Sequence, residues 1–172
     1  MKHLLKPFSL LLTLLFCVSC LCGCGAKEVK CPFTEANWES TIEDIKALET
    51  DLEEGGESSY YGASYLAPST YRDLDGTVQY MFDEEDNLAL VQWSYETDSL
   101  DELETLYQTI HNELTDSYGE GGFESQFSSS IGGDVWYLEN GNIILMFSAV
   151  DDYKAIHLSY VSPDHSLENP NK

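Results

Sequence analysis

All five cysteines of the 172-residue chain lie near its N-terminus, where their spacing makes them the first candidates for chemistry. They occupy positions Cys17, Cys20, Cys22, Cys24 and Cys31. Clustered thiols can form disulfides, bind a metal ion or act as nucleophiles, and each use needs partners at defined positions. No cysteine occurs in the rest of the chain, so the cluster indicates chemistry of the N-terminal segment itself.

The segment before the cluster has the layout of a secretory signal. Basic residues at positions 2, 3 and 6 are followed by the apolar run FSLLLTLLFCVS and then by the small residues Ser19, Gly23 and Gly25. The run is shorter than the roughly 20 residues of a membrane-spanning helix, and no later stretch is apolar for long enough. We therefore expect a secreted chain whose mature part has no transmembrane helix.

Within the cluster, LCGC at Leu21–Cys24 resembles the lipobox of bacterial lipoproteins, with Leu three residues before the cysteine and a small residue directly before it. The resemblance implies that a diacylglycerol is joined to Cys24 by a thioether and that the signal peptide, residues 1–23, is cleaved away. Cys22 departs from the family, which prefers Ala, Ser or Thr at that position. The prediction is a lipoprotein in the cell envelope, anchored on the extracytoplasmic side of the membrane. The alternative is an ordinary signal peptide.

Cys31 is then the only free thiol of the mature chain, so we expect no intramolecular disulfide. It lies in the expected tether, residues 24–33, which lacks the further ligands that a metal site needs. No histidine is near it in sequence. We therefore assign Cys31 neither a metal nor a catalytic role.

The chain is strongly acidic, with 31 Asp and Glu residues against 8 Lys and Arg residues and a net charge of −23. Cleavage would remove Lys2 and Lys6 but no acid, which makes the mature chain more negative still. Such a surface excludes nucleic acid as a partner and favours a solvated exterior. The more specific alternative is that the acidic surface binds a basic partner or, weakly, a divalent cation. DEEDN and RDLDGT lack the loop length and terminal Glu of an EF-hand, so we interpret both as turns and predict no metal.

Histidine and serine side chains raise the possibility of hydrolysis. His111 lies beside a helix stripe and is expected to face solvent, and His165 lies in a Pro- and Asn-containing tail. His157 is expected on a sheet face, with Ser94 and Ser159 nearby. Nothing in the sequence orders a nucleophile, a base and an orienting acid, and no phosphate loop or zinc signature occurs. We therefore predict that the protein is not an enzyme, has no catalytic residues and uses no cofactor.

Two helices are predicted from apolar residues at helical spacing. The first is capped by Thr34 and ends at Gly55-Gly56, with its stripe formed by Trp38, Ile42, Ile45, Leu48 and Leu52. The second begins at a capping box of Ser99 and Glu102 and ends at Gly119, with its stripe formed by Leu100, Leu103, Tyr107, Ile110, Leu114 and Tyr118.

Strands are expected after each helix, in YRDLDGTVQYMF and LALVQWSY and again in VWYLENGNIILMF and AIHLSY. Asp75-Gly76 and Asn140-Gly141 suit two-residue type I′ hairpins, because these turns need positive φ. The hairpins would pair Arg72 with Gln79 and Tyr137 with Ile144. DEEDN and VDDYK are expected as acidic turns.

The two halves align with each other without gaps, so that Gly76 falls on Gly141. We interpret residues 34–96 and 99–161 as similar halves of a single domain, followed by a disordered tail, residues 162–172. The predicted fold is α+β, a tandem helix-plus-antiparallel-meander repeat that forms two layers, with the helices on one face of an antiparallel sheet.

This tandem arrangement resembles the β-lactamase inhibitory protein and related small envelope lipoproteins of the outer-membrane assembly type. In that family two helix-and-meander halves share one curved sheet, and the resemblance implies that the open sheet face binds another protein. The inhibitor's disulfides have no counterpart in this sequence, and no contact residue is carried over.

Strand alternation sorts the side chains into two faces. The expected core face holds Tyr71, Val78, Tyr80, Phe82, Val91, Trp93, Tyr95, Trp136, Leu138, Ile143, Leu145, Phe147, Ile156, Leu158 and Tyr160. The opposite face has few acids and carries Tyr, Met and Arg, a composition typical of interface centres. Its candidate binding residues are Arg72, Gln79, Met81, Gln92, Tyr137, Ile144, Met146 and His157. A segment covering this face, or an exposed sheet without a ligand, remains an alternative.

The sequence thus predicts a small, acidic, extracytoplasmic binding module that is anchored to the membrane by lipid and binds or inhibits another protein. A structural envelope-assembly lipoprotein is the first alternative, and a hydrolase is the second.

Overall fold

The computed structural model describes residues 29–122 and 130–170. The expected signal peptide, the proposed lipidation site Cys24 and the first part of the tether lie outside the described residues. The chain forms α2 (Ile42–Leu48), β1 (Glu53–Glu57), β2 (Tyr61–Tyr71), β3 (Leu74–Asp83), β4 (Leu88–Glu96), α3 (Leu100–Tyr118), β5 (Ile131–Leu138), β6 (Gly141–Val150), β7 (Tyr153–Val161) and the short 3₁₀ helix η2 (Pro163–His165).

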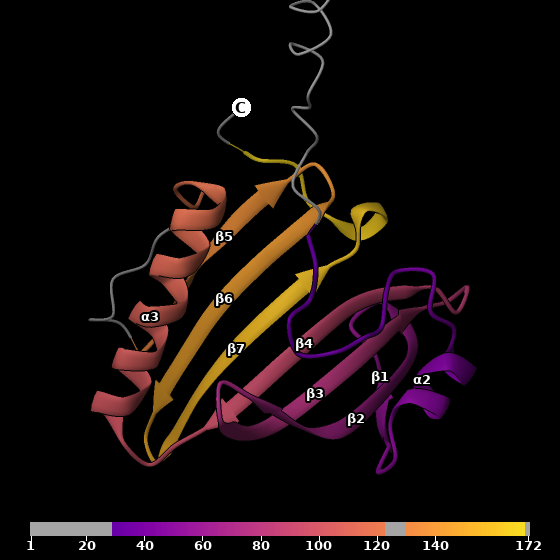
Figure 1. Ribbon diagram of the computed structural model, residues 1–172, viewed down its shortest axis with the longest axis horizontal. Coiled ribbons are helices and arrows are strands. Elements are labelled where there is room, and N and C mark those ends of the chain that lie inside the picture. The colour runs from indigo at the N-terminus through magenta and orange to yellow at the C-terminus, as the bar shows by residue number, and fades with distance from the viewer. Residues whose placement is uncertain (1–28, 123–129, 171–172) are drawn as a thin grey trace, which may run out of the picture.

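The strands form one antiparallel sheet in the order β1-β2-β3-β4-β7-β6-β5. The strands before α3 and those after it meet where β4 pairs with β7, in the middle of the sheet. Helix α3 packs on one face, across β6 and β7, and Figure 1 shows α2 at the opposite end of the sheet. The edge strand β1, EEGGE, carries three glutamates and a register shift between Glu54 and Gly56, features that discourage pairing with another chain.

The predicted tandem helix-plus-meander repeat is wrong. The fold is dominated by the seven-stranded sheet, and its helical part is small. Four strands precede α3 and three follow it, so the two halves do not repeat one unit.

The expected first helix shows where that prediction fails. Helix α2 has only seven residues and begins after Thr41, whose side chain forms a capping box with Asp44. Residues 53–57, expected at the end of the helix, form β1 instead. Trp38 and Leu52 do pack against the core, but from irregular segments. Their spacing reflected contact with the core and not a continuous helix, because tertiary packing overrides local preference.

The second helix is confirmed. The Ser99 side chain accepts a hydrogen bond from the Glu102 backbone N–H, and Gly119, at φ +88°, caps the C-terminus. The capping box is only half formed, because the Glu102 carboxylate accepts hydrogen bonds from Tyr95 and Thr97. The helix buries Leu103, Leu106, Tyr107, Ile110 and Leu114 against the sheet.

Both hairpin turns lie elsewhere than predicted. The β2–β3 turn is Arg72-Asp73, at φ 59° and 62°, with Tyr71 paired to Leu74. The β5–β6 turn is Glu139-Asn140, one residue earlier than expected, with Leu138 paired to Gly141. Because each register shift moves the pairing by an even number of positions, the assignment to the two faces survives for the side chains that remain in strands.

Gly76, expected in a turn, lies inside β3. A Cβ atom on Gly76 would lie 2.4 Å from the carbonyl oxygen of Ser94 and 2.7 Å from the indole nitrogen of Trp93. Glycine at this position therefore permits the close approach of β3 and β4, which is the reason for its presence in a strand.

The predicted core face is confirmed by burial. Most of its members are less than a tenth exposed, while Tyr71, Tyr95 and Leu138 are partly buried against the same cluster. Aromatic contacts join the sheet to α3, such as the edge-to-face contact between Tyr107 and Phe147 at 5.1 Å. The faces of the sheet are therefore unequal: one is packed under α3 and the N-terminal segment, and the other carries the candidate binding residues.

Both terminal segments take part in this packing. Val29 and Cys31 are buried, and the ring of Phe33 contacts those of Tyr71 and Tyr160 at 5.7 Å. Residues 29–33, assigned to the tether from sequence, thus belong to the packed domain. After β7, the chain continues through η2 to residue 170 and is held by side-chain contacts described below.

Candidate functional site

The candidate site is the sheet face opposite α3, called the open face here and defined by Gln79, Met81, Leu90, Gln92, Ser94, Tyr137, Ile144, Met146, His157 and Ser159. Strand pairing arranges these side chains in rows across the sheet. One row runs Gln79, Gln92, Ser159 and Ile144, and a second runs Ser94, His157 and Met146. The structure therefore brings together every candidate binding residue predicted from sequence except Arg72.

Arg72 lies on the other side of the sheet. Arg72 is a turn residue with positive φ, so its side chain does not follow the alternation of the strands. Its guanidinium forms a bidentate ion pair with Glu113 of α3, with N–O distances of 2.6 and 2.8 Å. The hydrogen bond from Arg72 lowers the pKa of the Glu113 carboxyl. Arg72 therefore ties the β2–β3 turn to the helix and is not a member of the candidate binding face.

A chain of side-chain hydrogen bonds crosses the centre of the open face. The Ser159 hydroxyl donates to Oε1 of Gln92 at 3.0 Å, and Nε2 of Gln92 donates to Oγ of Ser94 at 3.1 Å. Oγ of Ser94 lies 2.8 Å from Nδ1 of His157. Burial lowers the pKa of His157, opposed by the charge of Glu96. Burial therefore favours the neutral form of His157, and either Ser94 Oγ or His157 Nδ1 can be the donor in their contact.

None of the ten residues that define the open face is Asp, Glu, Lys or Arg, although the chain as a whole is crowded with carboxylates. Toward the strand ends, the same alternation places the exposed carboxylates of Asp75 and Glu96 on this side of the sheet. Exposed acids surround it instead, at both ends of the strands and along β1. They are Glu53, Glu54, Glu57, Glu84, Glu85, Asp86, Glu96, Asp98, Asp151 and Asp152. The arrangement is an uncharged surface inside an acidic border.

One end of this surface is apolar and exposed. Met146 is 42% exposed, and strand alternation places Ile131, Val150 and Tyr153 on the same face, at 57%, 41% and 44%. Ile131, Val150 and Tyr153 were not predicted to lie on this face, because the observed strands are longer than the expected ones. The continuing period of two along β6 was the signal that could have found them.

The other end of the open face is partly covered by the chain after β7. Nδ2 of Asn142 donates to the backbone oxygen of Leu167, and the Ser162 N–H donates to the oxygen of Ala89. Leu90 and Asn142 are buried there. The covering segment considered from sequence thus exists, but it leaves Met146 and its neighbours exposed.

Two further histidines pair with carboxylates away from the open face. Nε2 of His111 lies 3.1 Å from Oδ2 of Asp134, and the side chain of His111 is only 14% exposed. The prediction that His111 faces solvent is therefore wrong. Nε2 of His165 lies 3.1 Å from Oδ2 of Asp83, and its ring contacts Tyr60 edge-on. Both pairs fasten one element to another, α3 to β5 and η2 to the β3–β4 turn.

The Ser94–His157 pair has the spacing of a nucleophile and its base. Within residues 29–122 and 130–170, however, no carboxylate forms a hydrogen bond with His157, and the Ser94 oxygen also accepts from Gln92. A triad needs an acid to orient the imidazole. The geometry therefore favours a structural network over a catalytic one.

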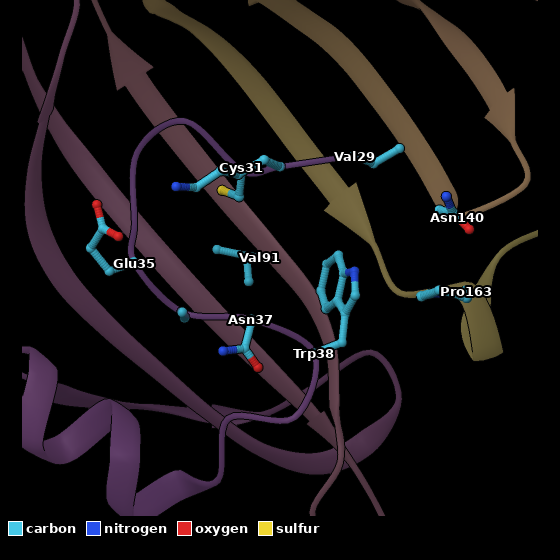
Figure 2. A pocket seen from close by; sticks show the side chains of 10 residues that line it. Val29, Cys31, Glu35, Asn37, Trp38, Val91, Asn140 and Pro163 are labelled. Atoms are coloured by element: carbon cyan, nitrogen blue, oxygen red, sulfur yellow. The ribbon is translucent and has the colours of Figure 1, made fainter. Parts of the chain in front are cut away.

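A cavity of about 540 Å³ lies on the opposite side of the sheet, between the N-terminal segment and the ends of β4 and β7. Figure 2 shows Val91 at its centre and Trp38 with its ring directed toward the stretch that carries Val29 and Cys31. Asn140 and Pro163 lie at its other end, and Lys30, Glu35, Ala36 and Asn37 complete the lining. Four segments distant in sequence build this space, and nothing in the sequence pointed to it.

No family model, curated protein or solved structure matches the chain. The resemblance to the β-lactamase inhibitory protein was based on the tandem repeat, and with that repeat corrected it carries no further argument. None of the helices in the described part is long and apolar enough to cross a membrane. Among the same residues, no group of three or more His, Cys, Asp or Glu side chains could hold a metal ion.

Proposed function

We propose that this chain is a lipid-anchored, extracytoplasmic binding module that holds a protein partner on its open face. The observation that carries the proposal is the uncharged, partly apolar surface inside an acidic border. The chain has a net charge of −23, yet the ten residues that define the open face are uncharged. Interface centres show the same depletion of charged residues together with Met and Tyr.

The chemistry of the face indicates the chemistry of the partner. Met146, Ile131 and Tyr153 can be buried against an apolar centre, and Met adapts its shape to the surface it meets. The surrounding carboxylates would favour Lys and Arg around that centre and repel an acidic surface. The partner is therefore a protein with an apolar patch and a basic rim.

The lipid anchor is supported by the lipobox-like LCGC, and the place where packing begins limits the distance between the anchor and the domain. The chain from Cys24 to Val29, five residues further on, spans at most about 17 Å when extended. Because Val29 is already buried in the domain, the domain must stay close to the bilayer. Two acyl chains suffice for stable attachment, whereas one is marginal.

Site-specific photocrosslinking in intact cells tests the binding face. A benzophenone amino acid at Met146 or Ile131 should give a discrete adduct with a basic protein. The same group at Glu104 or Gln108, exposed on α3, should not. The adduct should weaken as ionic strength approaches about 1 M, where the Debye length falls to about 3 Å.

Equal adducts from the helix positions, or none from the sheet positions, would overturn the binding proposal. The anchor is tested separately by Cys24→Ser, which should release the protein from the membrane fraction and remove the lipid mass. Continued membrane association without any loss of mass would reject the anchor.

A further inference from the structure

We infer that the cavity beside Trp38 binds a pyranose sugar unit of a glycan. The site is distinct from the open face and does not depend on the proposed protein partner. Its volume of about 540 Å³ lies within the range of small-molecule sites, roughly 300–1,000 Å³.

The walls of the cavity combine one flat aromatic surface with an aliphatic floor. Trp38 is half-buried and packs against the core, and Val91, which also lines the cavity, is 1% exposed. Val29 and Cys31 form the adjoining wall and are themselves buried, so the apolar surface is held in place by packing. A pyranose ring presents a face of C–H bonds that stacks on an indole in the same way as other flat apolar groups.

Polar groups lie around this apolar surface with capacity for hydrogen bonds. The Trp38 indole N–H and the Asn140 carboxamide make no hydrogen bond to any residue of the described ranges. Oδ1 of Asn37 accepts from the Glu39 N–H, which leaves the Asn37 amide hydrogens available. Carboxamides that donate and accept side by side match the hydroxyl groups at the edge of a sugar ring.

Other ligand classes fit the lining less well. An anionic ligand such as a phosphate would meet Lys30 as the only cation of the cavity, beside Glu35 and in a strongly acidic protein. A wholly apolar ligand would desolvate Asn37, Asn140 and Glu35 without replacing their hydrogen bonds to water, which is costly. A neutral ligand with an apolar face and a hydroxylated edge satisfies both parts of the lining.

The three tryptophans make the site easy to observe. Trp93 and Trp136 are 0% and 1% exposed, so a ligand-dependent change in emission reports Trp38. The full chain, purified in mild detergent, is titrated with oligomers of N-acetylglucosamine and of glucose. Mannitol, which has hydroxyl groups but no ring face, is the matched control.

We expect a saturable blue shift with at least one oligosaccharide and none with mannitol. Calorimetry should then show binding weakened about tenfold or more by Trp38→Ala, a loss of about 1.4 kcal/mol. Asn140→Ala, at an exposed turn, should weaken binding while leaving the melting temperature unchanged, and it keeps the test informative if Trp38→Ala fails to fold. Asn112→Ala, exposed on α3, should have no effect.

Either of two results would overturn the inference. One is the absence of saturable binding by every oligosaccharide of the panel. The other is sugar binding that Asn140→Ala and Trp38→Ala leave intact, since the sugar would then lie elsewhere.

Discussion

The hydroxyl oxygen of Ser94 on β4 lies 2.8 Å from Nδ1 of His157 on β7, although 63 residues separate them in the chain. The contact spans the junction where the strands before α3 join those after it. It is the link between the serine–glutamine network and the only histidine of the open face.

The first prediction concerns the pH dependence of stability through His157. Burial lowers the pKa of this imidazole in the folded state, so the unfolded chain binds the proton more readily. The contribution of neutral His157 to the free energy of unfolding is present above the ordinary histidine pKa, about 6.5. It is lost as the pH falls below that value. The free energy of unfolding should therefore fall more steeply from pH 7 to pH 5 in the native protein than in His157→Gln. Identical slopes in denaturant titrations would contradict this assignment.

The second prediction separates the two faces of β6 with adjacent substitutions. Met146→Asp places a charge on a side chain that is 42% exposed and should change the stability by less than about 1 kcal/mol. Leu145→Asp, one residue earlier and 0% exposed, buries an unpaired charge and should abolish folding. Urea unfolding followed by circular dichroism measures both. Unfolding of the Met146 variant would mean that this face is buried in solution.

The third prediction concerns the ion pair between Arg72 and Glu113. Arg72→Lys keeps the charge but loses the planar fork that binds both carboxylate oxygens, and it should cost up to about 1 kcal/mol. The effect should vanish in the background of Glu113→Gln, which a double-mutant cycle tests. The pKa of Glu113 is lowered by Arg72, so this stabilisation is present above the ordinary carboxyl pKa and lost in acid. Additive effects in the cycle would show that the pair contributes nothing.

The fourth prediction concerns the thiol of Cys31. Burial raises the pKa of this thiol from 9.0 to about 12, and this effect outweighs the backbone hydrogen bonds, which lower the pKa. The thiolate is the reactive form, so Ellman's reagent should label Cys31 only after unfolding. Since the folded pKa is the higher one, this group's contribution to stability is present below pH 9 and declines as the pH rises toward 12.

Reducing agent should leave the melting temperature unchanged, because Cys31 is free and buried and the proposed processing removes or lipidates the other four cysteines. Rapid labelling of the native protein, or a melting temperature that falls under reductant, would refute this account of the thiol.

The local features of the chain were readable from sequence alone. Helix α3 followed from its apolar spacing, from Ser99 at its start and from Gly119 at its end. The two faces of β3, β4, β6 and β7 followed from a period of two. This period depends only on the geometry of an extended backbone and survives any shift of register by an even number of positions.

Tertiary structure decided what depends on partners distant in the chain. Residues 53–57 became a strand because β2 offers them hydrogen bonds, and α2 shortened accordingly. Arg72 left the open face because the observed register made it a turn residue, with Glu113 of α3 within reach. The cavity beside Trp38 exists only where four separate segments meet. Register, turn position and cavities are set by long-range contacts, and no local pattern of residue types encodes them.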